Sequence, residues 1–114
     1  MGTMLQGRGL LPGMSPEVFS LERPDILKSI HVEYIQAGAD IITSNTFGGT
    51  SLKLPKELEV VSFNRKMAQI AKEATQGHGR PVFVAGSVGP TGHFIQPLGE
   101  LTFREMVEIF KQQI

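Results

Sequence analysis

The sequence predicts an α/β fold in which parallel strands are joined by helical crossovers. Helical and strand patterns alternate along the chain in the order helix, strand, helix, strand, helix, which is typical of a parallel sheet. In addition, both predicted strands are apolar at first and end in Ser, Thr, Asn or Gly. Ligand sites of parallel α/β proteins lie at the carboxyl ends of the strands, so we expect a site at that edge.

Composition limits the function. The 114 residues make one domain at most, and 11 basic against 11 acidic side chains argue against a general nucleic-acid binder. Because Cys is absent, the chain has no disulfide scaffold and no thiolate zinc site of its own. No apolar run approaches the ~20 residues of a membrane span, and the first residues lack the apolar core of a signal peptide. We therefore expect a cytoplasmic protein without nucleic-acid or membrane partners.

The first predicted helix follows a segment of turns. Residues 1–23 are expected to be rich in turns, because Gly and Pro interrupt any regular pattern there. Pro24 suits a first helical turn, and Gly38 suits a left-handed residue just after the helix. Between them an apolar stripe is predicted, formed by Ile26, Leu27, Ile30 and Tyr34.

Two short buried strands are predicted over residues 39–46 and 81–88. A helix over residues 57–76 should connect them and stop near Gly77. After the second strand we expect a turn at 89–92 and a long loop. Thr102 and Glu105 have the spacing of a capping box, which predicts a last helix that continues to the end of the chain.

The predicted elements do not complete a domain. Two parallel strands cannot close a barrel, and each would keep one unpaired edge. The last helix carries no Gly or Asn at its end, and no strand is predicted before the first helix. We therefore expect the chain to be part of a larger domain and to be capable of self-association through its open edges.

Other chemically active side chains are predicted to be structural. Asp40 lies at the beginning of its strand, where a stability or turn role is favoured. His93 is the titratable group of the loop after the second strand, and a solvated position is expected for it. His31 and His78 are expected to be packing or surface residues. The glycines at 7–13 lack the preceding strand and the spacing of a dinucleotide-binding loop.

Four segments carry more specific motifs. They read Met-Gly-Thr-Met-Leu-Gln at 1–6, Ala-Gly-Ala-Asp-Ile-Ile-Thr-Ser-Asn-Thr-Phe at 37–47, Ala-Gly-Ser-Val-Gly-Pro-Thr-Gly at 85–92 and Gln-Pro-Leu-Gly at 96–99. In order and spacing they resemble the N-terminal part of the homocysteine S-methyltransferase family, above all the homocysteine-binding region of bacterial cobalamin-dependent methionine synthases. The resemblance implies that residues 1–114 are the first third or so of a (β/α)8 barrel, truncated at both ends.

The resemblance also implies a reaction, the transfer of a methyl group to the sulfur of homocysteine to form methionine. In the full-length enzyme zinc would deprotonate the thiol, and cobalamin and methyl-folate are cofactors of the methionine synthase branch. The zinc-binding cysteines and the first-strand Asp of the family lie outside these residues. We therefore expect the isolated chain to bind no cofactor, to be inactive and to contribute only substrate-holding surface.

That surface is predicted at three places on the ligand face. Backbone N–H groups of the glycine-rich turns at Gly2-Thr3 and Ser87-Val88-Gly89 could bind the substrate carboxylate. Asn45 and Thr46 could bind the substrate through hydrogen bonds or brace the neighbouring loop. The alternative is that Asn45 and Thr46, and likewise Ser87 and Gly89, only form turns.

Two other functions remain open from the sequence. One is a small non-catalytic α/β module, which binds an anionic ligand through its turns or pairs with a partner chain that completes the sheet. The other is a barrel fragment of an aldolase-like lyase. The lyase is disfavoured because no Lys follows either predicted strand in a catalytic position.

Overall fold

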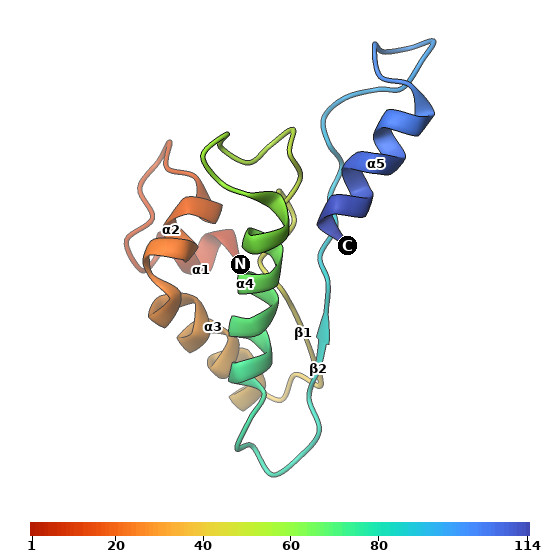
Figure 1. Ribbon diagram of the computed structural model, residues 1–114. Helices are drawn as coiled ribbons and strands as arrows, with labels where there is room; N and C mark the ends of the chain where they lie inside the picture. Colours follow the sequence, from red (N-terminus) through yellow and green to blue (C-terminus); the bar gives the residue numbers. More distant parts are fainter.

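A computed structural model describes all 114 residues and confirms an α/β fold with parallel strands. Strands β1 and β2 pair in parallel, with Ile41 opposite Phe83 and Thr43 opposite Ala85. The helix α4 forms the crossover between them (Figure 1). The elements in chain order are α1 (Gly2–Gln6), α2 (Pro16–Glu22), α3 (Pro24–Gln36), β1 (Ile41–Thr43), α4 (Val60–Ala74), β2 (Phe83–Ala85) and α5 (Phe103–Gln113).

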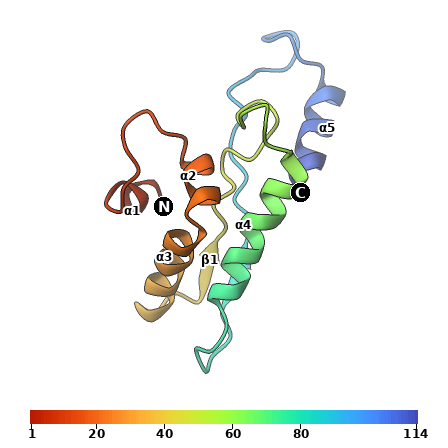
Figure 2. The same ribbon diagram turned by 60° about the vertical axis from the view of Figure 1, so that its left-hand side comes forward.

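The sheet is covered by helices on one face only. Both α3 and α4 pack beside the strands, and the two helices contact each other (Figure 2). Because strand side chains alternate between faces, Ile42 points into this helical layer and is buried against Ile35 and Ala71. Its neighbour Ile41 is 61% exposed on the other face, and Phe83 beside it is 65% exposed. We call this side of the sheet the open face.

The helical layer has two further apolar clusters. Leu27 of α3 packs against Phe63 and Met67 of α4, whose apolar residues recur at helical spacing. The stripe of α3 is not the predicted one, because Tyr34 is 42% exposed while His31 is buried. The second cluster joins the N-terminal segment to α3 and contains Leu5, Leu10, Phe19 and Ile30.

The prediction that residues 1–23 are rich in turns was right only in part: turns lie at residues 7–9 and 12–13, but two helices, α1 and α2, occupy most of the rest. The second helix has a clear beginning: the Oγ atom of Ser15 accepts a hydrogen bond from the N–H of Val18, and Pro16 occupies the first turn. Proline interrupts the interior of a helix, but Ser followed by Pro is also a helix start. The short α1 is held by Leu5, which is fully buried.

The other predicted elements exist, but most are shorter than expected. Each strand has three residues, and α4 begins at Val60 because the carboxylate of Glu59 accepts hydrogen bonds from the N–H groups of Val61 and Ser62. Two predicted helix termini are confirmed. Gly38, just after α3, is left-handed with φ +105°, and Thr102 and Glu105 form the predicted capping box at the beginning of α5.

The amino ends of the two strands are held together by Arg80. Its Nη1 atom pairs with Asp40 at 2.8 Å, and its Nη2 atom donates to the carbonyl oxygens of Ile35 and Ala39. These contacts connect the segment before β2 to the end of α3 and the beginning of β1. Asp40 thus has the structural surroundings expected at this edge.

The last helix lies apart from the N-terminal helices. In Figure 1, α5 stands beyond the carboxyl end of β2, and the only helix that it contacts substantially is α4. The loop before α5 and its first residue expose large apolar side chains, and Phe94, Leu98 and Phe103 are each at least 70% exposed. None of the helices combines the length and the apolar character needed to cross a membrane.

Candidate functional site at the carboxyl ends of the strands

Three hydroxyl-bearing residues join the carboxyl ends of β1 and β2. The Oγ1 atom of Thr46 donates to the carbonyl oxygen of Ser87 at 2.7 Å and lies 2.8 Å from the Oγ atom of Ser44. Because the proton of Thr46 is given to Ser87, the hydroxyl of Ser44 must be the donor of the second bond. The N–H of Ser87 in turn points to both hydroxyl oxygens, at 3.2 and 3.3 Å. Thr46 is therefore a structural link between the two strand ends.

Replacing Thr46 by valine should lower the free energy of unfolding by about 1–2 kcal/mol. The substitution keeps the shape of the side chain but leaves the part-buried carbonyl of Ser87 without its donor. Urea unfolding of the variant measures the loss. The matched control is Thr46→Ser, which keeps the hydroxyl and should cost clearly less; equal losses for the two variants would contradict the role of the hydroxyl.

A second crossing lies directly beyond this link, where the segments after the two strands touch. The N–H of Gly89 donates to the carbonyl oxygen of Phe47 at 3.2 Å. Gly89 is buried, and a Cβ atom at this position would lie 2.6 Å from the same oxygen. The close approach explains why the turn carries glycine here.

Asn45 lies directly beyond the last residues of β1, between the buried Ser44 and Thr46. Its side chain is half-buried. Its Nδ2 atom donates to the Oγ atom of Ser20 in α2 at 2.7 Å. This contact ties α2 to the carboxyl end of β1, so Asn45 braces a neighbouring segment.

The structure brings Asn45, Thr46, Ser87, Val88 and Gly89 together but not Gly2 and Thr3. The expected turn at Gly2-Thr3 is instead the first turn of α1, and no hydrogen bond joins it to either strand end. Within the second turn, the N–H groups of Ser87 and Gly89 are already used inside the chain, whereas that of Val88 has no partner. That these residues contact substrate stays a prediction.

Sequence reasoning missed Ser20 and Ser44. Ser20 lies in a segment for which no helix was predicted, so nothing indicated that it would reach β1. Ser44 directly precedes Asn45, and the alternation of side chains in a strand could have shown that it faces the same side as Thr46.

A cavity of about 620 Å³ lies between α4, the strand ends and the last turn of α5. Thr46 and Val88 line it, as do Asn64 of α4 and Gln113 of α5. The Nε2 atom of Gln113 donates to the carbonyl oxygen of Thr46 at 2.6 Å, which connects α5 to the strand end. Asn45, Ser87 and Gly89 do not line this cavity, which is on the helical side of the sheet and not on the open face.

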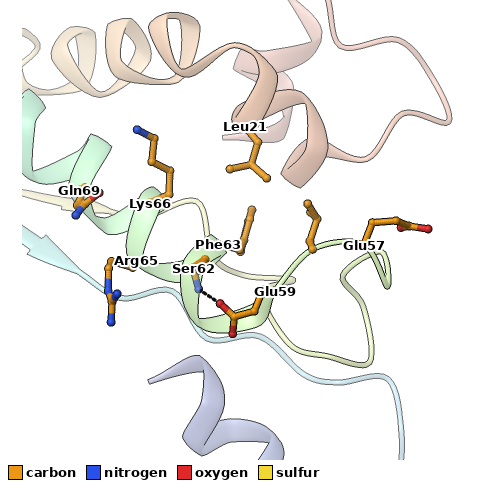
Figure 3. A pocket seen from close by; sticks show the side chains of 9 residues that line it. Leu21, Glu57, Glu59, Ser62, Phe63, Arg65, Lys66 and Gln69 are labelled. Carbon is orange, nitrogen blue, oxygen red and sulfur yellow. Dashed lines mark hydrogen bonds between the residues drawn. The ribbon is translucent and has the colours of Figure 1, made fainter.

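A second cavity, of about 390 Å³, lies between the end of α2 and the beginning of α4, and no strand-end residue lines it. Figure 3 shows Leu21 facing Phe63 across it, with Glu59 bonded to Ser62 at the helix start. Because Glu59 already caps the helix, these first-turn amides are not free to bind an anion. Its charged lining has both signs, from Glu57, Glu59, Arg65 and Lys66.

The three histidines do not form a catalytic group. His78 contacts the carbonyl oxygen of Ala74 at the end of α4, and His93 contacts that of Thr91 in an exposed loop. His31 is 1% exposed, and burial, together with the ammonium group of Met1, lowers its pKa to about 4. All three therefore have the structural or surface positions that were expected.

The chain does not offer a donor set for zinc. It has no Cys, and no three His, Asp or Glu side chains lie close enough together to hold a metal ion. Zinc needs soft or imidazole ligands in a tight tetrahedral arrangement. The residues present do not fit the metal that the family resemblance implies, so its ligands would have to come from elsewhere.

Comparison with known proteins confirms the resemblance. Two solved structures of the homocysteine methyltransferase MmuM from Escherichia coli, one metallated and one oxidized, match the chain with TM-scores of 0.64 and 0.63. In both cases the identity is 23%, and the match covers 81% of this chain but 36% of MmuM. This likeness shows a shared fold. The model of the homocysteine S-methyltransferase family matches residues 1–114, and the chain therefore belongs to this family.

Proposed function

We propose that the chain is the substrate-holding first part of an enzyme that transfers a methyl group to the sulfur of homocysteine, of the methionine synthase type. The observation that carries the proposal is the cluster of Asn45, Thr46 and 87–89 at the carboxyl ends of two parallel strands. In parallel α/β folds that edge is where ligands bind. Family membership supplies the reaction class.

The open face supports the view that these residues are part of a larger barrel. In a closed barrel the side chains of one strand face fill the interior, and here Ile41 and Phe83 form such a face without a cover. The chain spans 36% of the length of MmuM, and a complete (β/α)8 barrel needs about 250 residues. Until such a cover is in place, the open face and free strand edges would favour self-association.

Asn45 and the N–H of Val88 are the groups best placed to contact substrate. Asn45 lies just beyond the end of β1, and its Oδ1 atom has no hydrogen-bond partner in the chain and is not buried. Val88 carries the one free donor of the 87–89 turn and could bind the carboxylate of the amino acid. Thr46, Ser87 and Gly89 would keep these two groups at a fixed separation.

Activation of the thiol would have to come from outside this chain. A free thiol with a pKa of about 8.5 is mostly protonated at neutral pH, and the thiolate is the nucleophile. No side chain at the strand ends can take this proton, because the cluster has hydroxyls and amides but no base. Residues 1–114 would therefore bind and orient the substrate, in a cytoplasmic enzyme whose metal and methyl-donor sites lie in other segments.

The proposal predicts methyl transfer only in a completed domain. Residues 1–114 alone should form no methionine from homocysteine, because they hold no group that activates the thiol. A chimera in which they replace the corresponding part of E. coli MmuM should form methionine with the methyl donor of that enzyme. Methionine formation, measured by chromatography, checks both expectations.

The chimera is compared with its Asn45→Ala variant and with a control, Arg104→Ala, in the exposed first turn of α5. We expect Asn45→Ala to raise the KM for homocysteine about tenfold, as for the loss of one hydrogen bond to a charged group, and Arg104→Ala to leave it unchanged. Turnover by the isolated chain, or a cooperatively folded chimera without turnover, would contradict the proposal.

A further inference from the structure

Ser20 carries a hydrogen-bond arrangement that determines how Asn45 is oriented. Ser20 is completely buried in α2. Its hydroxyl donates to the carbonyl oxygen of Pro16 at 2.7 Å, one turn earlier in the same helix. A serine hydroxyl has a single proton, so after this bond Ser20 can only accept. The group that approaches it must therefore be a donor.

This requirement decides which end of the Asn45 amide faces α2. The Nδ2 atom of Asn45 is the donor that Ser20 accepts, at 2.7 Å. The Oδ1 atom is thereby turned away from α2. The Oδ1 atom has no hydrogen-bond partner in the chain. It is not buried either, so solvent reaches it. Asn45 consequently presents a hydrogen-bond acceptor, and not a donor, to its free surroundings.

We propose that Ser20 is a positioning residue that fixes the Asn45 carbonyl oxygen toward the solvent at the strand ends, where it selects a substrate with an ammonium group. An α-amino thiol such as homocysteine carries its ammonium group next to the carboxylate. The N–H of Val88 is a donor that suits the carboxylate, and Asn45 is an acceptor that suits the ammonium group. The inference rests on the proposed function, which places the substrate at the strand ends.

The test compares homocysteine with 4-mercaptobutanoic acid, which is the same molecule without its amino group. Binding of each to the 114-residue chain is measured by titration followed in ¹⁵N-resolved NMR spectra, which detect weak complexes. We expect the wild-type chain to bind homocysteine about tenfold more tightly, as for one hydrogen bond to a charged group. In Ser20→Ala this ratio should fall toward one, because the amide of Asn45 loses the contact that orients it.

Two more variants separate orientation from folding. Asn45→Asp keeps an acceptor at the position of Oδ1, so it should retain the preference for homocysteine. Asn45→Leu should lose the preference, and it carries the test if Ser20→Ala does not fold. The matched control is Ser29→Ala, since Ser29 also donates to a carbonyl oxygen of its own helix, that of Ile26, but does not touch Asn45. It should keep the wild-type ratio.

The outcomes distinguish this inference from the proposed function. A wild-type ratio near one, no saturable binding of either ligand, or an unchanged ratio in a folded Ser20→Ala chain would overturn the role of Ser20. If the chimera of the preceding section nevertheless forms methionine, the proposed function stands alone. Loss of the preference for homocysteine in Asn45→Asp would also overturn the inference, because it would mean that Nδ2 and not Oδ1 contacts the substrate.

Discussion

Replacing Gly89 by alanine should lower the free energy of unfolding by about 3 kcal/mol. The added Cβ atom would lie 2.6 Å from the carbonyl oxygen of Phe47 and 2.8 Å from two carbons of its ring. The exposed ring can turn away, but the carbonyl cannot, because it is backbone and accepts the N–H of Gly89 itself. Relief of the overlap would separate the two segments and break that bond, and overpacking of this kind costs about 1–3 kcal/mol before the bond is counted.

The chain offers a matched control three residues earlier. A Cβ atom on Gly86 would meet nothing within 4 Å, and the φ angle of Gly86 is not in the left-handed region. Gly86→Ala should therefore change the stability little, although it lies in the same connection. Urea unfolding of both variants, followed by circular dichroism, measures the difference. Similar stabilities for Gly89→Ala and Gly86→Ala would show that the two segments do not approach as closely as described.

Acidification from pH 6.5 to pH 4 should destabilise the chain by up to about 3 kcal/mol through His31. Burial, assisted by the Met1 ammonium group, lowers the pKa of this side chain to about 4, whereas the unfolded chain has a value near 6.5. The Nε2 atom of His31 has no hydrogen-bond partner to compensate for a charge. Below pH 6.5 the unfolded state therefore binds a proton that the folded state does not, and stability falls until the folded pKa is reached.

The pH range separates this effect from the titration of the carboxylates. Interactions within the folded chain lower the pKa values of Asp25, Glu59 and Glu105 below their ordinary values near 4, so they act at the acidic end of the range or below it. Urea unfolding at pH 7, 6 and 5 measures the contribution of His31. In His31→Leu, which cannot be protonated, the loss between pH 7 and 5 should disappear; an equal loss in this variant would exclude His31 as its source.

The parts of the fold that could be predicted are those governed by local chemistry. The capping box of Thr102 and Glu105 and the left-handed Gly38 each follow from a few neighbouring residues, and the parallel strands follow from the alternation of helices and strands. Family membership could be recognised because the spacing of four motifs is specific. The same reasoning failed for residues 1–23, where Ser15 and Pro16 begin a helix although Pro also interrupts helices.

The arrangement of the site depends on contacts between segments that are distant in the chain. Asn45 and Thr46 were identified as candidates, but tertiary contacts give them different partners, because Thr46 bonds to the end of β2 and Asn45 to α2. The partner of Asn45 is Ser20, on a helix that was not predicted. The donors of Ser87 and Gly89 were expected to be free, yet tertiary contacts use both. Residue types thus indicate where polar groups gather, whereas their availability depends on the fold.

The two uncovered edges of the sheet make the architecture extensible. Hydrogen bonds from the segment 40–44 to β2 leave the backbone groups of Ile41 and Thr43 on the outer side of β1, and β2 has an outer side of its own. Since the helices before and after β1 lie on one face, both edges can pair with a further strand in the plane of the sheet. Each helix–strand unit would offer the next one the same kind of surface, so the domain can grow by repetition in both directions.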